Sequence, residues 1–165
     1  MNTFDAKDSP DRIQPDRCRH TVDFNGARLY VYARSLATVL RVDGEIDASN
    51  ANNIANAIGR LARLKTPLIL DMSHLEFLSV DGFRALLVFY RAQQEARVHC
   101  SVVAGAAMRP LLRIVGEHSL PTAGSVAEAL QLIEDIVGER RQFLSDIVRH
   151  RQPLREVAQG APISP

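Results

Sequence analysis

The chain has 165 residues, a formal net charge of +1 at pH 7 and an apolar content of 46%. This length is sufficient for one domain with a hydrophobic core, and the near-neutral charge argues against a nucleic-acid partner, which usually requires a basic face. No apolar run is long enough to cross a bilayer and no signal peptide is visible, so we expect a cytoplasmic protein without membrane insertion.

The two cysteines, Cys18 and Cys100, do not have the spacing of a metal site. Their number favours a reducing compartment and predicts neither a disulfide framework nor a zinc site. Cys100 lies in an apolar run, so we expect it to be a core residue. A redox role for the pair stays an open alternative, although no neighbouring group activates either thiol.

The first part of the chain predicts a tail followed by two strands. Residues 1–21 are polar and are predicted to form a mobile tail, so we expect the domain to cover residues 22–137. Strands are predicted at 29–32 and 38–47. Gly44 interrupts the second strand, which is typical of a bulge or a close approach of two backbones.

Helices and strands alternate after residue 47. The predicted order is a helix capped by Ser49 or Asn50, a strand at 68–71, a helix through Phe83, Leu86, Leu87 and Tyr90, a strand at 98–104, a short helix near 111–115, a short edge strand at 120–122, and a helix capped by Ser125 with Glu128. This alternation argues for an α/β fold with a mixed sheet and helices packed on it.

The end of the chain is predicted to be an extension of the domain. Residues 138–165 are more charged than the domain and contain Pro153. Phe143, Leu144, Ile147 and Val148 predict one short amphipathic helix, which could pack on the domain or on a second copy in a homodimer. The last residues are predicted to be disordered.

The stretch from Leu68 to Phe83 organises the chain. Asp71 and Ser73 end an apolar strand as turn residues do, and we interpret the following residues as a loop that leads into the next helix. Ser79 is expected to be the N-cap of that helix. Asp81 is an acidic residue in the first turn, where it favours the helix macrodipole.

The same stretch contains a histidine beside potential catalytic partners. His74 follows Ser73 and Asp71, but adjacent residues of one loop rarely point at each other, and no nucleophile elbow is present. His99 and Cys100 alternate on a strand and therefore face opposite sides, which disfavours joint metal ligation. We predict a protein that is not an enzyme and that holds no metal and no cofactor.

Three motifs, in their order and spacing, resemble the STAS domain family. Val42-Asp43-Gly44-Glu45-Ile46-Asp47 resembles the family's second strand, Leu68 to Gly82 its central strand and loop, and Ala127-Glu128-Ala129-Leu130 its last helix. The resemblance covers Gly26 to Val137 and implies a STAS-like mixed β-sheet with about four helices packed on it. Stand-alone STAS proteins of this size most resemble bacterial anti-sigma-factor antagonists.

That resemblance implies a protein partner, namely an anti-sigma factor of the serine-kinase type. In the family, the unphosphorylated antagonist captures the anti-sigma factor and frees the sigma factor, which regulates transcription by partner switching. Phosphorylation at the start of the second helix stops this capture. An alternative function is that of a cytoplasmic STAS subunit in a membrane transport assembly, because function belongs to the site rather than to the fold.

One departure from the family pattern concerns the phosphorylated residue. The family's Ser or Thr lies two residues before the Gly, where this chain has Val80. Either Ser79 is an acceptor displaced by one residue, or the protein is not switched at this position. The second explanation is favoured, because a shift of one residue rotates a side chain by roughly a third of a turn. Asp81 is a poor copy of a phosphate, since it carries one charge on a short side chain.

The partner-binding surface is predicted at the corner from Ser73 to Phe83, on the exposed face of the helix that follows it, and on the loop around Asp43 to Ser49. Asp47 and Ser49 end their strand, and neighbouring strand ends of such a sheet could bring them beside Ser79. The predicted partner-binding residues are Asp47, Ser49, Ser73, Ser79, Val80, Asp81, Gly82 and Phe83.

Overall fold

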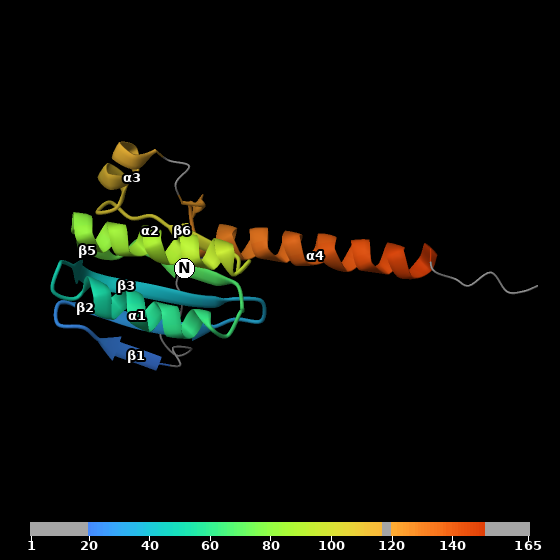
Figure 1. Ribbon diagram of the computed structural model, residues 1–165, viewed down its shortest axis with the longest axis horizontal. Helices are drawn as coiled ribbons and strands as arrows, with labels where there is room; N and C mark the ends of the chain where they lie inside the picture. The colour runs from blue at the N-terminus through green and yellow to red at the C-terminus, as the bar shows by residue number, and fades with distance from the viewer. Residues whose placement is uncertain (1–19, 117–119, 151–165) are drawn as a thin grey trace, which may run out of the picture. The chain divides into compact units, whose positions relative to one another are not determined.

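Alternating strands and helices form one mixed sheet with four helices in the computed structural model, which describes residues 20–116 and 120–150 (Figure 1). The strands are β1 (His20–Asp23), β2 (Ala27–Ala33), β3 (Thr38–Ile46), β4 (Leu68–Asp71), β5 (Leu75–Leu78), β6 (Cys100–Val103) and β7 (Thr122–Ala123). The helices are α1 (Ala51–Ala62), α2 (Val80–Glu95), α3 (Arg109–Val115) and α4 (Val126–His150). The predicted α/β class is confirmed.

The sheet has the order β1-β2-β3-β4-β6-β7, with β5 also paired to β3. The first three strands are antiparallel, whereas β3, β4, β6 and β7 are parallel to one another. Strand β3 is nine residues long, so its first half pairs with β4 and its second half with β5. After β3 the chain forms α1 and then the two strands β4 and β5, which both pair with β3.

Two strands of the sheet were not predicted. The segment Leu75–Leu78 was interpreted as a loop, but it is strand β5, paired in parallel with β3. Its ends are buried and its two middle residues are exposed, so it lacks the alternation that identifies a strand in sequence. Strand β1 begins at His20, within the predicted tail, and its exposed residues likewise carry no apolar pattern. The rest of that tail, residues 1–19 with Cys18, lies outside the described residues.

Gly44 produces the predicted irregularity in β3. Its backbone has φ of +91°, and the register between β3 and β5 shifts between Gly44 and Glu45. A Cβ on Gly44 would collide with the carbonyl oxygen of Gly26 in the neighbouring turn. The position therefore requires glycine for its conformation and for the close approach of two backbones.

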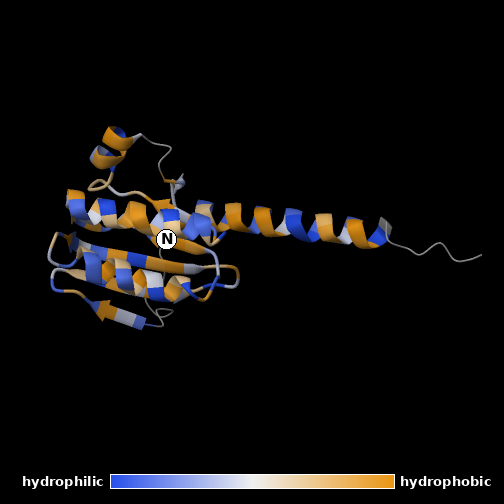
Figure 2. Ribbon diagram, viewed as in Figure 1, coloured by the Kyte–Doolittle hydropathy of each residue, from blue (hydrophilic) through white to orange (hydrophobic). Residues whose placement is uncertain are grey.

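The main core lies between one face of the sheet and the helices. Helices α1 and α2 show apolar and polar residues alternating around their axes, as expected for helices with one buried face (Figure 2). The core includes Leu40, Val42, Ile46, Ile54, Ile58, Leu70, Phe83, Leu86 and Val102. The predicted inward side of β3 is thus confirmed.

The opposite face of the sheet is also buried. Val39 and Ile69 are neighbours in the register of β3 and β4, and neither is exposed to solvent. Val126, Ala129 and Ile133, in the first turns of α4, are buried as well. Strands covered on both faces contain continuous apolar runs, which explains the sequence of β4.

Cys100 is a core residue, as predicted. Its side chain is 3% exposed, and burial raises the pKa of its thiol to about 12. The thiol is therefore almost entirely protonated at neutral pH and is a poor nucleophile. This chemistry argues against the redox alternative for Cys100.

Helix α4 begins with a variant of the predicted capping box. The Ser125 Oγ accepts a hydrogen bond from the Glu128 N–H at 3.1 Å, as predicted, while the Glu128 carboxylate accepts one from the Gly124 N–H at 2.6 Å. The helix then continues for 25 residues through Gly138, instead of ending there before a second helix. A glycine weakens a helix by about 1 kcal/mol relative to alanine but does not break it.

The chain divides into two compact units after Glu134. The first contains the sheet, helices α1 to α3 and the first turns of α4, and the described part of the second is the remainder of that helix. The last residues, Gly160 to Pro165, which the sequence predicts to be disordered, lie outside the described residues. Across residues 20–116 and 120–150, no helix is both long and apolar enough to span a bilayer.

Candidate functional site

The start of α2 is a rigid corner built on Ser79. Its backbone is extended, with φ of −70° and ψ of 161°, and its Oγ accepts a hydrogen bond from the Gly82 N–H at 3.0 Å. Its carbonyl oxygen accepts the first helical bond, from the Phe83 N–H at 2.9 Å. Ser79 is therefore the N-cap of α2, as the sequence predicts.

The corner is attached directly to the end of β3. The Ser79 N–H donates to the carbonyl oxygen of Ile46 at 2.8 Å, which continues the pairing between β5 and β3. A Cβ on Gly82 would lie 2.7 Å from the Ile46 Cγ2 and 3.0 Å from the Leu78 Cδ1. Glycine at this position thus lets the first turn of α2 lie against the strand, while Phe83 is buried in the core.

The loop after β3 is held by Asp47. Its Oδ1 accepts hydrogen bonds from the Ser49 Oγ at 2.6 Å, the Ser49 N–H at 2.8 Å and the Asn50 N–H at 3.3 Å. These bonds, led by the one from the Ser49 hydroxyl, lower the pKa of the Asp47 carboxyl. Because Asp47 follows Ile46 directly, this loop and the Ser79 corner leave the sheet from paired residues, as expected.

Asn50 has a larger role than the sequence indicates. It occupies the N-cap of α1, but its side chain makes no capping bond to that helix. Instead, its buried Nδ2 donates to the carbonyl oxygens of Phe24, Asn25 and Glu45, at 3.3, 3.2 and 2.9 Å, while its Oδ1 accepts from the Asp47 N–H at 3.0 Å. Asn50 therefore ties the turn between β1 and β2 to the loop after β3.

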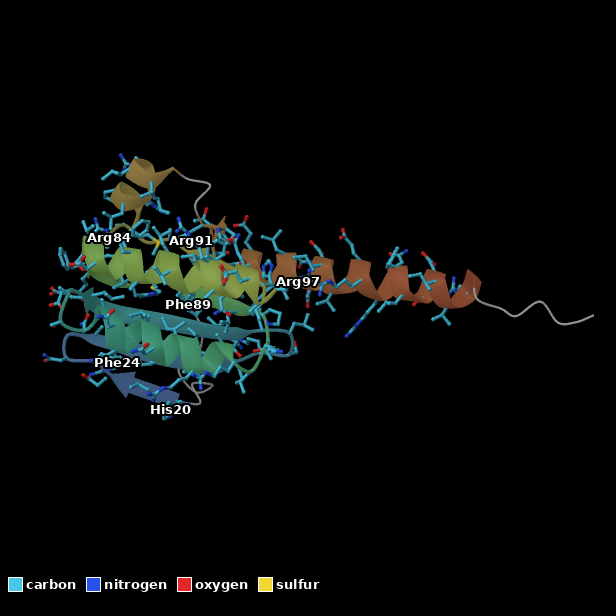
Figure 3. All side chains as sticks on the ribbon, in the orientation of Figure 1. His20, Phe24, Arg84, Phe89, Arg91 and Arg97 are labelled. Atoms are coloured by element: carbon cyan, nitrogen blue, oxygen red, sulfur yellow. The ribbon has the colours of Figure 1, made fainter. Side chains whose placement is uncertain are left out.

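Val80 is an exposed apolar residue on the first turn of α2. Its side chain is 54% exposed, and Val88 on the same helix is 68% exposed. Val80, Arg84, Val88 and Arg91 follow one another at helical spacing and are all exposed. Figure 3 shows Arg84 and Arg91 on the side of α2 opposite to the buried Phe89. We call these four residues the α2 stripe.

Two further side chains extend this surface. Phe77 in β5 precedes the corner, lies within the surface predicted from Ser73 to Phe83, and is 49% exposed. Asp81 forms an exposed ion pair with Arg84 at 3.6 Å, so its charge is partly balanced. The α2 stripe lies on the exposed face of the helix that the sequence assigns to the predicted surface, and Val88 lies outside the buried face formed by Phe83, Leu86 and Phe89.

Ser73 has partners in its own turn after β4. Its Oγ donates to the Asp71 Oδ1 at 2.5 Å and lies 2.9 Å from the His74 Nδ1. The expectation that these adjacent residues do not point at each other is therefore wrong. The order of contacts is nevertheless not that of a catalytic triad, because the serine, rather than the histidine, joins the other two groups.

The described residues contain no cluster of metal ligands, and they form cavities of different lining. Within residues 20–116 and 120–150, no group of three or more His, Cys, Asp or Glu side chains could hold a metal ion. A half-open cavity of about 460 Å³ lies between β1, β2 and α1, with an apolar lining that includes Val22, Phe24, Val31 and Leu61. Its polar lining residues are His20, Asn53, Asn56 and Arg60. A second cavity of about 370 Å³ is lined in part by Arg109 and Arg113.

The family model for the STAS domain matches residues 29–133. The chain belongs to the STAS domain family. Both the resemblance inferred from the sequence motifs and the predicted mixed sheet with about four helices are thereby confirmed. The matched residues include the β5–α2 corner and the loop after β3, and the match ends inside α4.

Among the proteins similar to this chain are two anti-sigma factor antagonists of known structure. Osmosensory protein A of Mycobacterium tuberculosis is 33% identical over 132 residues, which cover 77% of this chain and 84% of that protein. The crystal structure of an anti-sigma factor antagonist from Mycobacterium paratuberculosis has a TM-score of 0.60 at 28% identity, covering 66% of this chain and 94% of the other. The unphosphorylated anti-sigma factor antagonist SpoIIAA shares the fold, with a TM-score of 0.51 at 18% identity, covering 67% and 98% of the two chains.

Proposed function

We propose that this STAS domain binds an anti-sigma factor of the serine-kinase type and thereby regulates transcription by partner switching. The proposal is supported by the similarity to the antagonist from Mycobacterium paratuberculosis. It assigns no catalytic step to the chain. The observation that carries it is Val80, an exposed apolar residue at the start of the α2 stripe, on a corner fixed to the sheet.

The proposed contact surface combines apolar and basic groups. Val80 and Val88 supply apolar area that binding would remove from water, and Arg84 and Arg91 supply guanidinium groups for acidic side chains of a partner. Phe77 adds an aromatic side chain, a type enriched in interfaces. Asp47, Ser49 and Ser73 are proposed to contribute polar contacts at the rim of the surface.

We propose further that binding is not controlled by phosphorylation at the usual position. Val80 has no hydroxyl group, and Ser79 is half-buried with its Oγ engaged by the Gly82 N–H. To accept a phosphate, that oxygen would have to leave the N-cap and turn toward solvent. Loss of the N-cap hydrogen bond destabilises a helix by about 1 kcal/mol, and this loss opposes the rearrangement.

The experiment begins with a pull-down from the native cell extract, using wild type, Val80→Asp and Leu64→Asp. Leu64 is an exposed apolar residue after α1 and outside the proposed surface, so it is the matched control. Wild type and Leu64→Asp should recover an anti-sigma factor. Val80→Asp should bind about tenfold or more weakly, because it replaces an apolar contact by a carboxylate that has to lose water on binding. Recovery of transporter subunits instead would support the alternative function.

The absence of a phosphorylation switch is tested by incubation with the recovered partner and ATP, followed by intact mass and affinity measurements. Wild type should carry no phosphate and keep its affinity, while Val80→Ser should keep binding and become a candidate acceptor. Stoichiometric phosphate on wild type, with a loss of affinity that Ser79→Ala abolishes, would show that Ser79 is a displaced acceptor.

A further inference from the structure

Helix α4 carries, from Leu132 to Val148, a long apolar surface that the described residues leave uncovered. Its exposed large apolar residues are Leu132, Ile136, Phe143, Leu144, Ile147 and Val148, with exposed fractions between 36% and 71%. Such a concentration on one element is unusual for a surface that faces only water. The STAS family match ends at residue 133, so almost all of this surface lies beyond the family domain.

These residues form one continuous side of the helix. Leu132, Ile136, Phe143 and Ile147 follow one another at intervals of four, seven and four residues, which places them nearly in line on an α-helix. Leu144 and Val148 lie one residue further on and widen the line into an arc. We call the six residues the α4 seam, and a seam with this spacing is typical of a helix that packs against another helix.

The charges along the helix are divided between its two halves. Within the segment 132–149, the first half, residues 132–139, has three acidic residues, Glu134, Asp135 and Glu139, and no basic residue. The second half, residues 140–149, has three arginines and a single acidic residue. An antiparallel copy of the helix would place the acidic half of each chain opposite the basic half of the other. A parallel copy would place like charges opposite each other.

Arg140 is the one charged residue within the arc of the α4 seam. Its long side chain can extend along the apolar surface and place its guanidinium at the edge of the pair, within reach of a carboxylate of the other copy. A single polar residue in such a seam also selects one alignment of the helices.

We propose that the α4 seam binds the α4 seam of a second copy of this chain, as an antiparallel and two-fold symmetric helix pair. In such an interface both chains contribute the same surface, so each apolar residue of the seam is buried once in each chain. This inference does not depend on the proposed partner-switching function, because the seam and the α2 stripe share no residue. It adds a second interaction surface, which would make the protein bivalent for a partner bound at α2.

The first test is the mass of the full chain in solution, measured by light scattering and sedimentation equilibrium. The wild type should have about twice the chain mass of 18.3 kDa. The double variant Phe143→Glu, Ile147→Glu should be a monomer with unchanged helical content by circular dichroism. Should that variant fail to fold, Leu144→Gln with Val148→Gln provides a milder change with the same expected result. Val88→Glu, an exposed valine outside the seam, should remain a dimer.

The second test measures orientation. A spin label at Arg149→Cys, in a Cys18→Ser background, should give a distance between the two labels of roughly 20 Å or more in an antiparallel pair, since each residue advances 1.5 Å along the helix. A distance near 10 Å, the separation of neighbouring helix axes, would refute the antiparallel arrangement.

Two outcomes would overturn the proposal itself. The first is a wild-type chain that is a monomer at all concentrations. The second is a dimer that both seam variants leave intact, because the interface would then lie elsewhere, and dissociation of that dimer by Val88→Glu would place the interface at the α2 stripe.

Discussion

Replacement of Gly82 by alanine tests how tightly the corner of α2 packs on β3. The added Cβ would lie 2.7 Å from the Ile46 Cγ2 and 3.0 Å from the Leu78 Cδ1, and both neighbours are buried. Overpacking of this kind costs about 1–3 kcal/mol, whereas alanine regains at most about 1 kcal/mol of helix propensity. With the full gain in helix propensity, we therefore expect Gly82→Ala to lower the free energy of unfolding by between about 0 and 2 kcal/mol.

The chain offers a matched control for this substitution. Gly59 lies in α1, and no atom would lie within 4 Å of a Cβ on it. Gly59→Ala should therefore raise the free energy of unfolding by about 0.5–1 kcal/mol. Both changes are measured by urea unfolding, with equal m-values as the condition for comparing them. The packing argument fails if Gly82→Ala raises the free energy of unfolding as much as Gly59→Ala does.

Three further predictions concern buried or hydrogen-bonded side chains. Asn50→Ala leaves several carbonyl oxygens without their donor and should lower the free energy of unfolding by about 2 kcal/mol or more. In the same urea assay, Asn52→Ala at an exposed position should change the free energy of unfolding little. Hydrogen bonds hold the folded pKa of Asp47 below 3.8, so its contribution is present above pH 3.8 and is lost as the pH falls through the lower folded value. The stability difference between wild type and Asp47→Asn should thus narrow in acid, and a difference that widens would contradict the assignment. In a Cys18→Ser background, the Cys100 thiol should react with a thiol reagent at pH 8 only after unfolding, and rapid reaction of the folded protein would show that Cys100 is accessible.

The parts of the fold that were predictable from sequence are those in which one local pattern decides the structure. The apolar run at 68–71 and the periodic apolar residues of α2 are unambiguous, and Gly44 signals the irregularity in β3. Strands β1 and β5 were missed because their side chains do not alternate between buried and exposed. Their strand conformation comes from pairing with β2 and β3, which a local pattern does not contain.

The candidate site shows the same division between local and distant contacts. The N-cap role of Ser79 was predictable, because it depends on a residue three positions away. The role of Asn50 was not, because its side chain binds the carbonyl oxygen of Phe24, which lies 26 residues earlier in the chain. The contact between Ser73 and His74 was excluded from sequence on a general tendency that this turn does not follow.

The pairing of β3 with both β4 and β5 has a consequence for the kinetics of binding. The Asp47 loop follows β3, and the Ser79 corner follows β5, whose last residue pairs with the last residue of β3, so their separation is fixed before any partner arrives. A partner would therefore meet a preorganised surface, and association would require little additional ordering of the backbone. Differences in affinity among surface variants should then appear in the dissociation rate, while the association rate stays nearly constant.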